Sequence, residues 1–145
     1  DEYLSEVITE LQQGYQYGIF SAAVADYQPV QTFSGKIPSG QLAKIDLVPT
    51  QKVIGEVKAK FPSLGMITFK YQENISHEKL MTIAHSRLQQ GYQMVVANRG
   101  EESQTVGSQV AYLVTKNSQP QRAVGKQEIA EAIANYLETA VEKAG

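Results

Sequence analysis

Residues that could contact a ligand stand at the ends of three runs of apolar residues. They are Asp26, the pair Phe69-Lys70 and Asn98. Lys36 follows Asp26 by ten residues, in a stretch rich in Gly, Pro and Ser. If the apolar runs are parallel strands, their ends meet at one edge of a sheet, where open α/β sheets bind ligands. A carboxylate, two lysines, an aromatic ring and an amide at that edge would suit a nucleotide-type or phosphate-type ligand.

Two of these residues also have purely structural interpretations. Asp26 can cap the turn after its strand, because aspartate accepts hydrogen bonds from nearby backbone N–H groups. Lys36 can be an ordinary solvated loop lysine. The sequence contains no phosphate-binding P-loop and no Gly-x-Gly-x-x-Gly motif. It also marks no nucleophile–base pair and no pair of catalytic carboxylates by spacing.

Composition excludes several classes of protein. The 145 residues, 42% hydrophobic and 19% charged, predict a single globular domain over residues 1–145. The net charge of −2 comes without a basic tract, which argues against nucleic-acid binding. No apolar run approaches the roughly 18 residues of a membrane span. The two histidines, His77 and His85, do not make a metal site by themselves.

The expected location of the protein is the cytoplasm. Cysteine is absent, so disulfides, thiolate catalysis and cysteine-based zinc sites are excluded. The chain opens on Asp1-Glu2-Tyr3, without the basic start and apolar segment of a signal peptide.

Hydrophobic periodicity and turn residues predict alternating helices and strands. Helices are expected at residues 2–13, 49–60, 76–88 and 126–143, the last with Ile129, Ile133, Leu137 and Val141 facing inward. Strands are expected at 17–25, 43–47, 65–69, 94–97, 109–115 and 121–124, with a long loop or flap at 27–42 and another loop at 99–107. The first of these strands is expected to be buried on both faces, because residues 19–25 are small or apolar without alternation. This order predicts a three-layer, Rossmann-like α/β sandwich with a mainly parallel central sheet, a flap loop and a C-terminal β-hairpin.

Two local patterns add detail to the predicted order of helices and strands. Ser76 is a predicted N-cap, with Ile75 and Leu80 at the staple positions on either side. The hexapeptide Leu-Gln-Gln-Gly-Tyr-Gln occurs at residues 11–16 and again at 88–93, each time between a predicted helix and a predicted strand. The chain therefore uses the same helix-to-strand joint twice.

Four short motifs resemble those of one enzyme family, phosphopantothenoylcysteine synthetase, also called phosphopantothenate–cysteine ligase. In order, they are Ala-Ala-Val-Ala-Asp-Tyr at 22–27, Lys36-Ile37, Ile-Thr-Phe-Lys at 67–70 and Val-Val-Ala-Asn at 95–98. The first motif with its lysine ten residues on is fairly specific, whereas Phe-Lys and Val-Ala-Asn alone would be weak. The resemblance extends from about Tyr17 to Leu137.

The resemblance implies a ligase that joins 4′-phosphopantothenate to cysteine in coenzyme A biosynthesis. A nucleoside triphosphate, CTP in most bacterial members and ATP in eukaryotic ones, activates the carboxylate as an acyl-nucleotidylate with Mg²⁺. The cysteine amine then displaces the nucleotide monophosphate. Members of this family are homodimers with a Rossmann-like fold and an active-site flap.

The family's functional residues carry over to matching positions of this chain. Lys36 would be the catalytic lysine of the flap, neutralising phosphate or acyl-phosphate charge. The predicted nucleotide- and substrate-binding residues are Ala22, Ala23, Asp26, Phe69, Lys70, Arg87 and Asn98. Arg87 stands near the position of a lysine in CTP-using bacterial members, although it can equally be a solvated helix residue. Gly91 stands near a second such lysine, so the choice between CTP and ATP stays open.

The family's upstream half, with a Gly/Ser-rich nucleotide loop and an asparagine that contacts the acyl intermediate, has no counterpart in these 145 residues. The chain therefore resembles the C-terminal part of the enzyme, with the missing N-terminal half as a possible partner. The alternative is a non-catalytic remnant of the fold that acts as a dimerisation or binding module. Some relatives are fused to a flavin-dependent decarboxylase, but nothing in this sequence corresponds to that domain.

Overall fold

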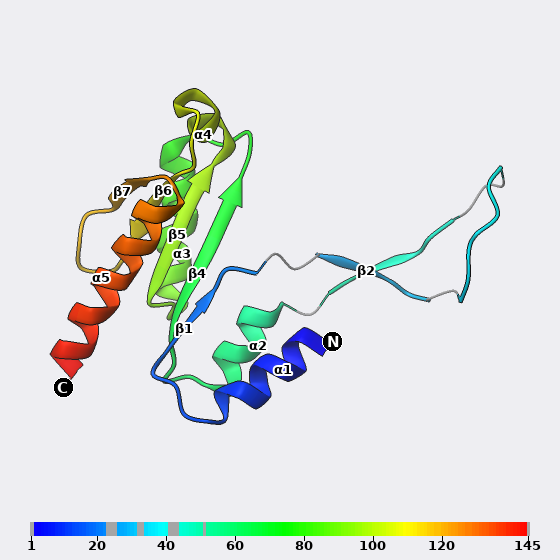
Figure 1. Ribbon diagram of the computed structural model, residues 1–145, viewed down its shortest axis with the longest axis horizontal. Coiled ribbons are helices and arrows are strands. Elements are labelled where there is room, and N and C mark those ends of the chain that lie inside the picture. Colours follow the sequence, from blue (N-terminus) through cyan, green and yellow to red (C-terminus); the bar gives the residue numbers. More distant parts are fainter. Residues whose placement is uncertain (1, 23–25, 32–33, 41–43, 51, 145) are drawn as a thin grey trace. The chain divides into compact units, whose positions relative to one another are not determined.

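The computed structural model describes residues 2–22, 26–31, 34–40, 44–50 and 52–144 (Figure 1). These residues form two compact units. The first comprises the chain up to Tyr15 together with Ala22–Pro62, and the second comprises Gln16–Ser21 and the chain from Ser63 onward.

The first unit consists of two helices and a two-stranded ribbon: α1 (Glu2–Leu11), β2 (Tyr27–Pro29), β3 (Leu47–Pro49) and α2 (Val53–Lys60). Strands β2 and β3 are antiparallel, with Tyr27 opposite Pro49 and Pro29 opposite Leu47. Residues 27–42 are therefore not loop throughout, because β2 begins the flap. Pro29 fits this strand because a two-stranded ribbon leaves outward-facing N–H positions that need no partner.

The strand expected at residues 43–47 is displaced toward the C-terminus. Ala43 lies outside the described residues, residues 44–46 carry no strand, and β3 begins at Leu47. The alternation of apolar and charged residues that predicted a strand at 43–47 is thus only a local pattern, since the pairing of Leu47 with Pro29 fixes where β3 begins.

The second unit is built on a five-stranded sheet with the order β1-β4-β5-β6-β7. Its strands are β1 (Tyr17–Phe20), β4 (Gly65–Gln72), β5 (Met94–Arg99), β6 (Val110–Val114) and β7 (Gln121–Val124). The pairs β1–β4 and β4–β5 are parallel, whereas β6 is antiparallel to both β5 and β7. Four strands therefore share one direction, which confirms the mainly parallel sheet and the C-terminal hairpin.

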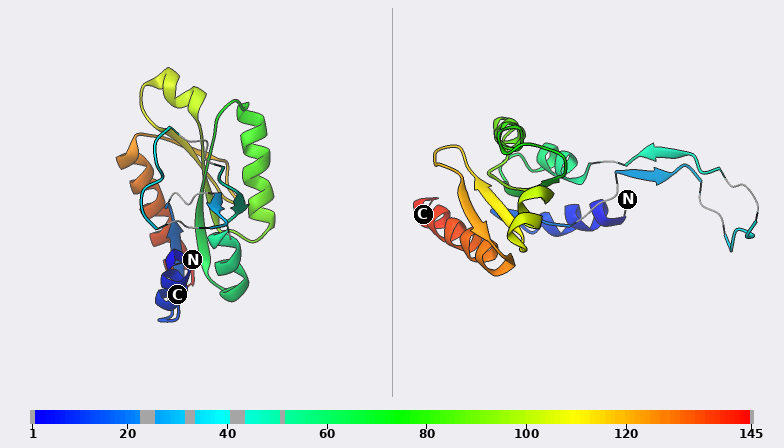
Figure 2. Two further views of the ribbon diagram at one scale, coloured as in Figure 1. Left: turned by 90° about the vertical axis from the view of Figure 1, so that its right-hand side faces the viewer. Right: turned by 90° about the horizontal axis from the view of Figure 1, so that it is seen from above.

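One helix covers each face of this sheet (Figure 2). Helix α5 (Lys126–Ala144) packs through Ile129, Ala132 and Ile133 on a cluster that includes Ile67, Met94, Val96, Ala111, Leu113 and Ala123. Helix α3 (His77–Gln89) packs through Leu80, Ala84 and Leu88 on a cluster that includes Ile75, Val95, Ala97 and Val114. The second unit is therefore a three-layer α/β sandwich, as the sequence predicts.

Local signals at the start of α3 and at the repeated joint are confirmed. The Ser76 hydroxyl accepts a hydrogen bond from the Lys79 N–H at 3.2 Å, so Ser76 is the N-cap. Gly14 and Gly91 both adopt the left-handed conformation, with φ of 93° and 101°. Only glycine enters this region without strain, which explains why the repeated hexapeptide contains it.

Three expectations about the sheet and its helices are wrong. Strand β1 ends at Phe20, Ile19 is 50% exposed, and neither Ser21 nor Ala22 is in a strand. Strand β1 is an edge strand with one neighbour, β4, so the unbroken apolar run does not mark burial on both faces. Residues 23–25 lie outside the described residues.

The other two corrections concern helices. Residues 99–107 contain a helix, α4 (Gly100–Val106), ended by Gly107 with φ of 78°, where the sequence predicted a loop. Two acidic residues in its first turn favour this helix by complementing its dipole. Val141, expected to face inward, is 47% exposed, because it lies beyond the part of α5 that contacts the sheet cluster.

Among the described residues, no helix combines the length and apolar character that crossing a membrane requires.

Candidate functional site

Phe69 and Asn98 lie on one face of the sheet, near the carboxyl ends of β4 and β5. The two strands are parallel and in register, with Phe69 opposite Val96 and Asn98 opposite Tyr71. Side chains alternate along a strand, so Phe69 shares the α5-covered face with Ile67, and Asn98 shares it with Val96. The structure therefore brings these two predicted residues together as diagonal neighbours.

Asn98 is a largely buried polar side chain at the end of β5. It is 9% exposed, and its amide makes no hydrogen bond to another described residue. An amide offers two donors and an acceptor for hydrogen bonds to a ligand. The sheet thus presents an unused hydrogen-bonding group at the edge where α/β sheets bind ligands.

The same face of the sheet carries a groove of about 750 Å³ beside α5. Its wall is mostly apolar, with Ser21, Gln109 and Lys126 as polar members. The apolar and small lining residues are Ile19, Phe69, Ile129, Ala130, Ile133, Ala134 and Leu137. An apolar groove with a few polar groups is typical of small-molecule sites, and its size falls within their usual range.

Of the predicted site residues that the structure describes, Phe69 alone lines this groove. Sequence reasoning missed Ser21, Gln109 and Lys126 as lining residues. The sequence did offer one indication for Lys126. It is a charged residue at the start of the last predicted helix, directly before the apolar residues of that helix. Nothing in the sequence marked Ser21 or Gln109 as site residues, because only the fold places them beside Phe69.

Lys70 and Arg87 belong to the opposite side of the sheet. Alternation along β4 places Lys70 on the face away from Phe69. Arg87, on α3, donates from Nη1 to the carbonyl oxygen of Phe69 at 3.1 Å. Burial lowers the pKa of the Arg87 guanidinium and raises the pKa of the neighbouring Tyr92. Arg87 is therefore a half-buried residue bound to the β4 backbone, rather than a freely solvated helix residue.

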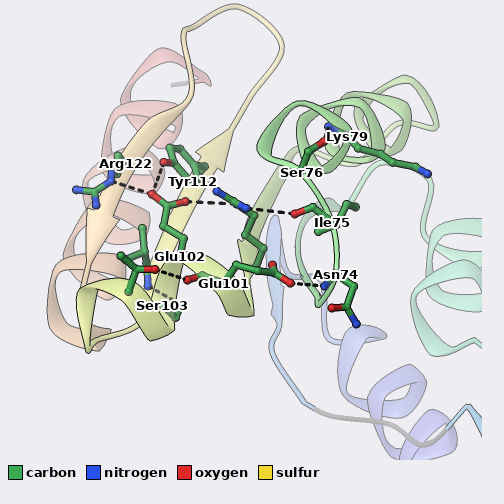
Figure 3. Close-up of polar contacts among 12 residues, drawn as sticks. Asn74, Ile75, Ser76, Lys79, Glu101, Glu102, Ser103, Tyr112 and Arg122 are labelled. Carbon is green, nitrogen blue, oxygen red and sulfur yellow. Dashed lines mark hydrogen bonds and ion pairs between the residues drawn. The ribbon is translucent and has the colours of Figure 1, made fainter.

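A polar network holds the segments that follow β4 and β5 (Figure 3). The Glu101 carboxylate accepts a hydrogen bond from the backbone N–H of Asn74, which has φ of 56°. Arg99 donates from Nη1 to the carbonyl oxygen of Ile75 at 3.2 Å. Hydrogen bonds from the backbone N–H groups of Glu101 itself and of Asn74 hold the pKa of the Glu101 carboxyl below its usual value. These contacts tie the turn after β4 to the start of α4.

Glu102 is the centre of the second half of this network. Its carboxylate accepts a hydrogen bond from the Tyr112 hydroxyl at 2.7 Å and from Arg122 Nε at 3.4 Å (Figure 3). It also pairs with Arg99 Nε at 3.8 Å. Burial, followed by the hydrogen bond to Glu102, raises the pKa of Tyr112. Because Arg99 directly follows Asn98, this network fixes the backbone that carries the buried amide.

The remaining predicted residues belong to the first unit and are exposed. The carbonyl oxygen of Asp26 accepts from the Thr50 N–H at 2.8 Å, which closes the base of the ribbon, while the Asp26 carboxylate bonds no other described residue. Lys36 forms no ion pair with another described residue. Ala22 is exposed, and Ala23 lies outside the described residues. The functional roles of these residues stay predictions.

The described residues contain no group of three or more His, Cys, Asp or Glu side chains placed to hold a metal ion.

Residues 1–141 match the family described as the DNA/pantothenate metabolism flavoprotein C-terminal domain. The chain belongs to this family. Two curated relatives, from Thermococcus kodakarensis and Methanocaldococcus jannaschii, are each 28% identical and carry the name coenzyme A biosynthesis bifunctional protein CoaBC. The matches cover 95% and 97% of this chain but 35% of each relative. The chain thus spans about a third of the length of these relatives, and the match identifies it with one domain of a longer architecture.

Solved structures of the C-terminal domain family share the fold. The DNA/pantothenate metabolism flavoprotein from Streptococcus pneumoniae is 27% identical with a TM-score of 0.74, covering 94% of this chain and 69% of that one. The C-terminal domain of CoaBC has a TM-score of 0.71 at 19% identity, covering 98% and 62%, and shows the fold alone. The family match and the two CoaBC relatives confirm the family inferred from the four motifs.

Proposed function

We propose that this chain acts in coenzyme A biosynthesis as part of a ligase that joins 4′-phosphopantothenate to cysteine. The reaction would use CTP or ATP with Mg²⁺ to activate the carboxylate as an acyl-nucleotidylate, releasing pyrophosphate. The cysteine amine would then displace the nucleotide monophosphate. Membership of the family and the names of the two CoaBC relatives support this place in metabolism.

The observation that carries the proposal is the position of the Asn98 amide, which hydrogen-bonds no other described residue, on the same face of the sheet as the groove that Phe69 lines. Asn98 is 9% exposed, shares a face of the sheet with Phe69, and lies where β5 ends. A ligand with matching donors and acceptors would hydrogen-bond this amide. A base or an acyl amide has the hydrogen-bonding groups for that, and an aromatic ring offers a face for stacking.

Lys36 is the proposed catalytic cation. Negative charge accumulates on phosphoryl and acyl oxygens in both half-reactions, so a positioned ammonium stabilises each transition state. Lys36 is exposed and forms no ion pair with another described residue, which leaves its charge available. Closure of the flap over a hydrolysable intermediate would also exclude water. Asp26, Ala22 and Ala23 are further proposed ligand contacts.

Mg²⁺ would arrive with the nucleotide. This ion is usually held by substrate phosphates, waters and one or two carboxylates rather than by a full cage of protein ligands.

The proposed assembly is a homodimer that forms through the β2–β3 ribbon, in the cytoplasm. Apolar side chains on and beside this ribbon are exposed by 40–58%: Tyr27, Val30, Ile45, Leu47 and Val48. A ribbon with exposed apolar side chains and unpaired edges favours pairing with a second copy.

Val48→Lys should convert a dimer to a monomer in sedimentation equilibrium, and a monomeric unmodified chain would exclude this assembly.

Calorimetric titration with CTP and with ATP, each with Mg²⁺, tests the function. The chain is titrated alone and after addition of the upstream half of a CoaBC ligase. Binding of one nucleotide, together with formation of its monophosphate when 4′-phosphopantothenate and cysteine are supplied, is the expected result. An absence of both binding and turnover in the supplemented sample would contradict the ligase proposal and leave the dimerisation or binding module as the explanation.

Lys36→Gln should abolish the supplemented turnover without lowering the melting temperature. Lys44→Gln is the matched control, because Lys44 lies in the same unit, is exposed and has only a surface ion pair with Asp46 at 3.5 Å. Equal turnover by the two variants would show that Lys36 is an ordinary loop lysine.

A further inference from the structure

A second cavity lies at the opposite edge of the sheet from Asn98. It has a volume of about 710 Å³ and is formed where β1, β5 and β7 begin and β6 ends, against the second half of α5. Its lining includes Gly91, Gln93, Lys116, Asn117, Tyr136 and Lys143. None of these residues is a proposed ligand contact of the ligase site, although Gly91 stands near a position that the sequence comparison linked to nucleotide choice.

The charge of this cavity is positive. Lys116 and Lys143 are its ionised side chains, and no aspartate or glutamate is among its described lining residues. Neither lysine forms an ion pair or hydrogen bond with another described residue. The chain as a whole carries a net charge of −2, so the cavity is a local concentration of unpaired positive charge.

A hydrogen bond links two polar residues of the cavity lining. Gln93, just before β5, donates from Nε2 to the Tyr136 hydroxyl on α5 at 2.7 Å. Around this pair, the lining offers amide and hydroxyl groups from Thr115, Asn117 and Ser118. Such groups donate hydrogen bonds to anionic oxygens without adding opposing charge.

We propose that this cavity binds a small phosphorylated molecule. A lysine ammonium is a compact point charge that suits phosphate, and two of them match a ligand with more than one negative charge. The volume is within the range of small-molecule sites. The site is independent of the ligase proposal, because it uses the other edge of the sheet and different residues.

Titration of the ¹⁵N-labelled full chain with pyrophosphate, followed by amide chemical shifts at low salt, tests this site. The amides of Gly91, Asn117 and Ser118 should shift in a saturable way. Lys116→Gln and Lys143→Gln should each raise the dissociation constant about fivefold or more, the loss expected for one unit charge about 4 Å from the anion in water. Added salt should weaken binding as well.

Lys79→Gln is the matched control, since Lys79 is an exposed lysine on α3 that does not line the cavity. It should bind pyrophosphate like the unmodified chain, and all three variants should melt at the same temperature. The proposal is overturned if the three lysine variants bind equally, if the shifts gather around Asn98 instead, or if no amide shifts. Equal affinity for citrate would overturn the assignment to phosphate.

Discussion

Removal of the Tyr112 hydroxyl should destabilise the protein through the network around Glu102. Tyr112→Phe deletes the donor to the Glu102 carboxylate at 2.7 Å and keeps the ring, which meets His77 at a centroid distance of 4.6 Å. A hydrogen bond to a charged group contributes about 1.5–3 kcal/mol. Since Tyr112 is partly exposed and Glu102 keeps Arg122 and Arg99 as partners, the expected loss is about 1.5 kcal/mol, at the low end of that range.

Urea unfolding followed by circular dichroism measures this loss, and a thermal melt should show a decrease of about 5 °C. The effect should also depend on pH in a defined direction. Burial and the Glu102 hydrogen bond raise the pKa of Tyr112 in the folded state, so the neutral phenol is the form that folding favours. The stabilisation is therefore complete below the unfolded tyrosine pKa of about 10 and is lost as the pH rises through the higher folded value. Unmodified and Tyr112→Phe chains should differ by a constant amount from pH 6 to 9 and converge above pH 10.

Tyr27→Phe is the control, because Tyr27 is 58% exposed and donates to no other described residue. Its free energy of unfolding should change by less than about 0.5 kcal/mol. The reasoning is refuted if Tyr112→Phe and Tyr27→Phe are equally stable at pH 7, or if the loss in Tyr112→Phe persists unchanged at pH 11.

Four further substitutions test other local features, each by urea unfolding at pH 7. Ser76→Ala removes the N-cap of α3 and should cost about 1 kcal/mol, and an unchanged midpoint would show that the cap does not stabilise the helix. Leu80→Ala opens a cavity at a fully buried position of α3 and should cost about 3 kcal/mol, whereas a loss below 1 kcal/mol would mean that the site collapses. Gly55→Ala should stabilise by about 0.5 kcal/mol because it lies within α2 with free space at its Cβ position, but Gly107→Ala should destabilise by about 1 kcal/mol because its φ is 78°. A change of the same sign in both glycine variants would contradict the backbone argument.

The local sequence was enough to predict where an element begins or ends when neighbouring residues set that boundary. Ser76 with its apolar neighbours predicts where α3 begins, and the glycine at 91 predicts where the chain turns into β5. Caps and left-handed glycines act through bonds between near neighbours, so no distant contact is needed to recognise them. Alternation of helices and strands likewise determined the α/β class and the mainly parallel sheet.

Local sequence patterns gave wrong predictions where contacts with distant residues decide whether a segment is buried or helical. The apolar run at 19–25 predicted a buried strand, but β1 lies at the edge of the sheet and Ile19 is half exposed. The polar stretch at 99–107 predicted a loop, although Glu101 and Glu102 find partners on other elements that hold α4 in place. Neither the sheet order nor these partners can be read from neighbouring residues.

For the candidate site, too, some features were predictable from the sequence and others depend on the tertiary structure. The sequence by itself determined which residue types end the strands, and hence that Phe69 and Asn98 stand near one edge of a parallel sheet. Only the tertiary structure decided that these two share a face while Lys70 lies on the other, that Arg87 is bound to the β4 backbone, and that Lys126 lines the groove. The physical reason is that hydrogen-bond capacity and charge belong to a residue, whereas burial, pairing and the choice of face depend on which distant segment packs against it.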